Sequence, residues 1–147
     1  MASLLQPISV NGAGVDLSAR MGGNSTVVAS PATNAATVVA SIPAIQSAVV
    51  AASGVIIFAQ VAYTVGTSGT AATYKIRQGT TAGAGSTIFN SGAITSGIAA
   101  GNLVVENVFG FDTSPTFPGQ AYCLELTITG GAATSTVSAA VMNYIIV

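Results

Sequence analysis

Charge is the scarcest property of this sequence: only 5% of its 147 residues are charged, and the formal net charge is -1. Ordinary soluble domains carry about 25% charged residues, which keep their surfaces hydrated and dispersed. A chain of this length fits one domain, and with so few charges it would be poorly soluble as a free monomer. The composition therefore favours a subunit whose surface is largely covered by other protein.

Histidine is absent, which removes the most common general base and metal ligand. The four carboxylates, Asp16, Glu106, Asp112 and Glu125, are scattered singly, without the paired spacing of an acid–base dyad or a metal site. The three basic residues are too few to supply the phosphate contacts that bind nucleic acid. We therefore expect no catalytic residue, no metal, no cofactor and no nucleic-acid partner.

The single cysteine, Cys123, cannot form an internal disulfide and has no histidine to activate it. We expect a structural thiol in a strand, which fits assembly in a reducing cytoplasm. The glycine-rich stretch GTTAGAG, residues 79–85, lacks the GK[ST] ending of a phosphate-binding loop and is followed by the strand-like STIF. It is predicted to be a turn.

The most apolar stretch, residues 47–65, is interrupted by Ser53, Gly54 and Gln60 and is not flanked by Lys or Arg. Its Val and Ile content suits β-strands better than a membrane-spanning helix, so we expect no membrane partner. The N-terminus has no basic n-region, and polar residues break its apolar run, so we expect no signal peptide.

Short Val/Ile/Thr/Tyr segments alternate with Gly- and Pro-containing turns along most of the chain. This pattern predicts an all-β fold, an antiparallel sandwich or barrel of about eight strands. The candidate strands are residues 25–30, 35–42, 54–65, 73–79, 86–92, 102–111, 120–129 and 135–147.

Residues 1–24 differ from the rest, with scattered apolar side chains and Gly breaks. We predict an extended N-terminal arm over residues 1–24, anchored on a partner subunit, and a β-domain over residues 25–147. An N-terminal strand that folds back on its own sheet is the alternative.

Two candidate strands carry most of the charge. In TYKIRQG, alternation places Tyr74 and Ile76 on one face and Lys75 and Arg77 on the other. In AYCLELTIT, the polar face carries Glu125, which would lie across from Lys75 or Arg77 if the two strands are neighbours. Two interpretations are open: a solvated sheet face, or a subunit interface at which Lys75 and Arg77 contact carboxylates of a neighbouring subunit.

The C-terminal AVMNYIIV, residues 140–147, is apolar on both faces apart from Asn143. Such a strand lies either in the centre of the fold or at a subunit interface. We predict the interface, formed by Met142, Tyr144 and Ile146.

Two long segments, GVIIFAQVAYTVGTSGTAATYKIRQGTTAGAGSTIF and GQAYCLELTITGGAATSTVSAAVMNYIIV, resemble the jelly-roll domains of tailed-phage virion proteins and the trimeric tumour-necrosis-factor-like jelly rolls. The resemblance covers about residues 50–147. It implies a jelly-roll β-sandwich and the role of a capsid decoration, or cement, protein: a homotrimer on the outer capsid surface of a bacteriophage that bridges major capsid protein subunits. It also implies that the arm contacts the capsid, through Leu4, Leu5, Pro7, Ile8, Val10, Val15, Leu17 and Arg20.

Two other functions remain open. A head- or tail-fibre tip that binds host glycan or protein would expose aromatic side chains in loops, for which Phe109, Phe111 and Phe117 are the candidates. A pilin-like or surface-array subunit would use its arm to complete the sheet of a neighbour.

Overall fold

The chain is all-β in the computed structural model, with no helix among the residues that the structure describes. These are residues 8–10, 13–15, 21–25, 31, 33–46, 54–67, 71–95, 99–130 and 134–147. The strands are β1 (Ile8–Val10), β2 (Ala13–Val15), β3 (Met21–Ser25), β4 (Thr37–Ile45), β5 (Val55–Thr67), β6 (Ala71–Gln78), β7 (Thr87–Asn90), β8 (Leu103–Asp112), β9 (Gln120–Thr129) and β10 (Thr134–Ile146).

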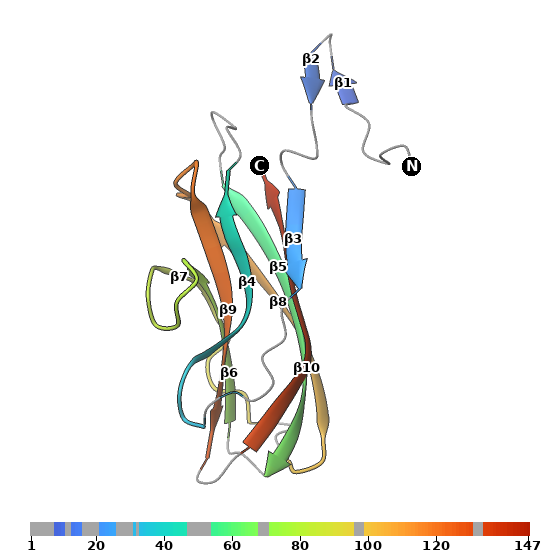
Figure 1. Cartoon of the computed structure of the whole chain (residues 1–147), viewed down its shortest axis with the longest axis vertical. Helices are drawn as coiled ribbons and strands as arrows, with labels where there is room; N and C mark the ends of the chain where they lie inside the picture. The colour runs from blue at the N-terminus through green and yellow to red at the C-terminus, as the bar shows by residue number, and fades with distance from the viewer. Residues whose placement is uncertain are drawn as a thin grey trace.

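Eight of the strands form two antiparallel four-stranded sheets that pack face to face (Figure 1). One sheet has the order β3-β10-β5-β8 and the other β4-β9-β6-β7, so consecutive strands from β3 to β10 alternate between the sheets except for β6 and β7, which form a hairpin within one sheet. This is the double Greek key of a jelly roll. The predicted all-β jelly-roll sandwich of eight strands is confirmed.

The N-terminal part begins with a separate small sheet. β1 and β2 pair only with each other, Ile8 opposite Val15, and Figure 1 shows this hairpin beyond one end of the sandwich. β3 then pairs with β10, so the sheet includes residues on both sides of the predicted boundary between residues 24 and 25. The candidate strand at 25–30 lies mostly outside the described residues.

Apolar side chains of alternate positions fill the space between the sheets. Along β5 these are Val55, Ile57, Ala59, Val61, Tyr63 and Val65, all buried. β9 and β6 contribute Tyr122, Leu124, Leu126, Tyr74 and Ile76 from the opposite layer. The period of two that predicted the strands is therefore also the period of the core.

Two polar ties join the sheets inside the sandwich. The buried Asp112 of β8 accepts hydrogen bonds from the Tyr122 hydroxyl and the Gln78 amide, both 2.8 Å long, and from the Ser114 backbone N–H at 3.0 Å. The hydroxyls of Tyr63 and Tyr74 are 2.7 Å apart. Each tie fixes how the sheets are placed on one another, because a buried polar group without its partner would be costly.

No helix in the described part of the chain has the length and apolar character needed to cross a membrane.

Candidate assembly surfaces

The outer side of the β10-β5-β8 sheet is the most unusual surface of the molecule. The strand registers place outward-pointing residues of the three strands in rows across it. From one end to the other the rows are Thr136–Thr64–Leu103, Ala139–Ala62–Val105, Val141–Gln60–Asn107, Asn143–Phe58–Phe109 and Ile145–Ile56–Phe111. We call these five rows the apolar outer face; none of their residues is charged.

Large side chains of this face are open to solvent. Phe109 is 52% exposed, Val105 51% and Leu103 64%. The rings of Phe58 and Phe109 meet edge to face, with their centroids 5.3 Å apart. Scattered exposed apolar residues are normal on a protein, but a contiguous apolar patch marks a surface that contacts something else.

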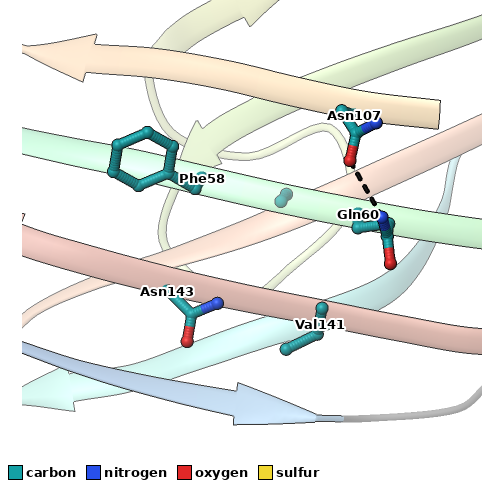
Figure 2. A pocket seen from close by; sticks show the side chains of 6 residues that line it. Phe58, Gln60, Asn107, Val141 and Asn143 are labelled. Atoms are coloured by element: carbon teal, nitrogen blue, oxygen red, sulfur yellow. Dashed lines mark hydrogen bonds between the residues drawn. The ribbon is translucent and has the colours of Figure 1, made fainter.

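A shallow depression of about 270 Å³ lies near the middle of the apolar outer face. Figure 2 shows its lining, with Phe58 on one side and three amide side chains, Gln60, Asn107 and Asn143, around it. The Gln60 amide donates a 2.9 Å hydrogen bond to the Asn107 carbonyl oxygen. Because each amide both donates and accepts, the depression can pair with many polar, uncharged groups.

The charged side chains that the structure describes lie elsewhere. Asp112 is buried between the sheets, and Glu106 is half-buried on the inner side of β8, where its charge acts on Tyr63 and Tyr74. Lys75, Arg77 and Glu125 belong to the opposite sheet. The two sides of the sandwich therefore differ in charge: one has none and the other has an ion pair.

That ion pair holds a loop over the second sheet. β6 and β9 are neighbours, so the condition for Glu125 to lie across from Lys75 is met, and Lys75 stands opposite Glu125. The Arg77 Nε donates to Glu125 Oε2 at 2.9 Å, and the Gly83 backbone N–H donates to Glu125 Oε1 at 2.6 Å. Arg77 Nη1 also reaches the Gly85 carbonyl oxygen at 3.3 Å. Both oxygens of Glu125, which is 1% exposed, are thus occupied within one chain.

The loop that carries these contacts is built from glycine. Gly79, Gly83 and Gly85 all have positive φ angles, between 72° and 90°, which other residues rarely adopt. A Cβ on Gly85 would also collide with the Gln78 carbonyl oxygen. The stretch predicted to be a turn is therefore a tight glycine loop folded back on the outer side of β9.

The predicted interface residues fall into two groups. Lys75, Arg77 and Glu125 lie on the outer side of the β4-β9-β6-β7 sheet, where a subunit contact through them stays a prediction. Met142 is 0% and Ile146 2% exposed, and both belong to the core together with the half-buried Tyr144. The three residues predicted for the interface thus lie on the inner face of β10. The sequence could not distinguish the two faces, because a strand that is apolar on both sides does not indicate which side is turned inward.

The predicted capsid-contacting arm is described only in part. Ile8, Val10 and Val15 lie in the β1–β2 hairpin. Leu4, Leu5, Pro7, Leu17 and Arg20 lie outside the described residues. Their contact with a capsid stays a prediction.

Cys123 is fully buried on β9, beside Arg77 of β6. Burial, reinforced by the nearby charge of Glu125, raises the pKa of its thiol to about 11. A thiol with such a pKa is neutral and unreactive at neutral pH, which agrees with a structural thiol. Burial also raises the pKa values of Tyr63, Tyr74 and Tyr122 above their usual value of 10. Among the described residues, no three His, Cys, Asp or Glu side chains gather in a group that could hold a metal ion.

The apolar outer face was not predicted from the sequence. Phe109 and Phe111 were candidates for aromatic side chains exposed in loops, whereas they stand on strand β8. Phe117, the third candidate, packs partly buried against the core. Phe58 and Val105 were not singled out. The signal available was the apolar side chains at alternate positions, Leu103, Val105, Phe109 and Phe111, interrupted by Asn107. This alternation does not indicate which side of the sheet these residues occupy.

No protein-family model matches this sequence, and no curated protein matches it either. Solved structures show the fold. A structure of infectious bursal disease virus, Gt strain, aligns with a TM-score of 0.55 at 15% sequence identity, and the crystal structure of the infectious bursal disease virus VP2 subviral particle aligns with a TM-score of 0.53 at 18% identity. Each match covers 97% of this chain and 39% of the viral chain.

This chain therefore spans under two fifths of the viral chains that it matches. A pilus protein of Bacillus endospore appendages aligns at 13% identity, over 87% of this chain and 89% of its own, with a TM-score of 0.44. The two viral matches show a shared fold, an antiparallel sandwich.

Proposed function

We propose that the protein is a non-enzymatic structural subunit of a virion: a decoration, or cement, protein that binds the outer capsid surface of a tailed phage and bridges its major capsid subunits. The observation that carries the proposal is the apolar outer face, with Phe58, Val105 and Phe109 about half exposed and no charge beside them. A contiguous apolar surface of this kind marks a site that contacts another protein.

The fold and the composition support the same proposal. A chain of the VP2 subviral particle of infectious bursal disease virus has the same kind of sandwich. With 5% charged residues, most of the surface is suited to contact with neighbours rather than with water. In the proposal the protein is a homotrimer that assembles in the host cytoplasm and remains on the outer surface of the virion.

The arm is the proposed attachment to the capsid. β1 and β2 pair with each other and with neither sheet of the sandwich, so an arm contact would not disturb the core. Its apolar residues, together with Arg20, would lie against the major capsid protein.

A deletion tests this attachment. Because β3 begins at Met21, the deletion removes residues 1–20 and leaves the whole sheet intact. Capsids that lack the protein are mixed with either the full chain or the shortened chain and are then sedimented. We expect the full chain to sediment with the capsids and the shortened chain to stay in solution, with the same circular dichroism and unfolding temperature. Equal binding of both chains would exclude the arm as the attachment, and failure of the full chain to bind would exclude the decoration role.

A fibre-tip module that binds glycan is the second candidate. The depression between Phe58 and the amides of Gln60, Asn107 and Asn143 favours it, because amides bond sugar hydroxyls and an aromatic face covers sugar C–H groups. A glycan array probed with the wild-type chain and with Asn107→Ala tests this candidate. Binding that is lost in the variant would favour the fibre tip over the decoration protein.

A further inference from the structure

We infer that the apolar outer face is the surface through which copies of this chain meet one another around a rotation axis. The inference rests on the proposed function only for the number of copies, three. A second copy of this chain covers the face, and the outward side chains of β10, β5 and β8 make the contact. The predicted subunit interface therefore moves from Met142 and Ile146 to the opposite side of the same strand.

Size is the first argument. Three strands spaced about 4.8 Å apart, each about ten residues long at about 3.3 Å per residue, give a face of roughly 500 Å² in projection. The accessible area of a face that carries phenylalanine and leucine side chains exceeds its projection. It is thus comparable with the roughly 800 Å² per partner that a stable specific interface buries.

Charge is the second argument. Near a rotation axis each residue meets copies of itself, so a lysine or a glutamate there would face its own charge. Like charges placed opposite one another are destabilising. The five rows of the apolar outer face carry no charge at all, although the other sheet of the same molecule carries Lys75, Arg77 and Glu125. A face that binds a different protein has no such restriction and usually has a polar, charged rim.

The polar residues of the face fit a self-contact as well. Gln60, Asn107 and Asn143 surround the depression in Figure 2, and the amides of Gln60 and Asn107 already bond each other. An amide carries both a donor and an acceptor, so copies of the same amide can pair with one another. Polar groups of this kind can be buried by a symmetric contact without leaving one of them unsatisfied.

The test introduces charge of either sign at one exposed position. Phe109→Lys and Phe109→Glu place a charge on a side chain that is 52% exposed in the single chain, so the fold should tolerate both. Val105→Lys and Val105→Glu, at 51% exposure one row beyond the depression, repeat the test if the Phe109 variants do not fold. The matched controls are Thr80→Lys and Thr80→Glu, at an exposed loop position that follows β6 of the other sheet.

Analytical ultracentrifugation measures the mass of each variant over a range of concentrations. We expect the wild-type chain and both Thr80 variants to sediment at three times 14.3 kDa. Phe109→Lys and Phe109→Glu should each raise the concentration needed for assembly by about a hundredfold or more. In either variant, each copy would bury a charge next to the same charge of a neighbouring copy. A monomeric wild-type chain would overturn the inference, and so would Phe109 variants that assemble like the wild type. Dissociation by only one sign would also overturn it, because Phe109 would then lie against a charged surface elsewhere on the neighbouring copy and not against the same uncharged face.

Capsid sedimentation separates this inference from the proposed function. A trimer that does not bind capsids would exclude the decoration role and leave the self-contact in place. A monomer that binds capsids would exclude the self-contact and leave the decoration role.

Discussion

Replacing Arg77 with alanine should destabilise the protein because it leaves the carboxylate of Glu125 buried without a counter-charge. The Glu125 side chain is 2% exposed, and of its partners among the described residues only the Gly83 N–H would still bond it after the substitution. Removing one partner of a buried ion pair costs about 3–5 kcal/mol. Since the Arg77 side chain is 16% exposed, water can enter part of the space it leaves, and we expect a loss of about 2–4 kcal/mol. That is a large part of the roughly 5–15 kcal/mol of a typical domain.

Lys75→Ala is the matched control, since it removes a half-buried basic residue from the same strand two positions away. It should change the free energy of unfolding by about 0.5–1 kcal/mol at most, because Arg77 and not Lys75 bonds Glu125. Glu125→Gln keeps an acceptor for Gly83 and leaves a partly hydrated arginine, so it should cost about 1–2 kcal/mol.

Urea unfolding followed by circular dichroism measures these differences, at one fixed protein concentration because self-association adds to apparent stability. The reasoning fails if Arg77→Ala and Lys75→Ala destabilise the protein equally. It also fails if both leave stability unchanged while assembly is lost, since the pair would then act between subunits.

Three further predictions concern buried polar groups. Because burial raises the pKa values of Tyr63, Tyr74 and Tyr122 above 10, the unfolded chain loses these protons first. The stability that these tyrosines contribute is therefore complete below about pH 10 and is lost as the pH rises further. Urea unfolding between pH 8 and 11 checks this, and a free energy of unfolding that does not change with pH would contradict it. Cys123 should react with a thiol reagent at pH 8 only after unfolding, and rapid labelling of the native protein would be inconsistent with its buried position and a pKa of about 11. Tyr122→Phe removes one hydrogen bond and should lower the free energy of unfolding by about 1 kcal/mol. Asp112→Ala leaves three donors without their acceptor and should lower it by about 2–4 kcal/mol. If urea unfolding gave the reverse order, this account of the hydrogen bonds between the sheets would be refuted.

The strands themselves could be predicted from the sequence because their signals are local. β9 occupies residues 120–129 as predicted, and β6 and β7 form the hairpin expected around TTAGAG. Tyr74 and Ile76 point into the core. Alternation of side chains and glycine turns determines such features within a few residues.

The side of the sheet that β8 turns inward could not be predicted in this way. Its alternation separates Phe109 and Phe111 from Gly110 and Asp112, and hydrophobicity alone would turn the phenylalanines inward. The structure turns Gly110 and Asp112 inward instead. A Cβ on Gly110 would lie 3.1 Å from side-chain carbons of Ile76 and Ile88, so the opposite sheet already fills the space. Asp112 is accepted because three donors from elsewhere in the chain converge on it. Both reasons lie in residues distant in sequence.

The two central strands show how differently this chain treats its two sheets. On the outer side of β9, the glycine loop after β6 and the side chain of Arg77 cover Glu125, which is 1% exposed. On the outer side of β5, Phe58 is 43% exposed, and none of the described residues covers its row. On one sheet a carboxylate is therefore shielded from water by its ion pair, whereas on the other sheet an aromatic ring is left in water. An exposed aromatic ring is unfavourable for a monomer, and burying it becomes a gain once a second copy covers Phe58.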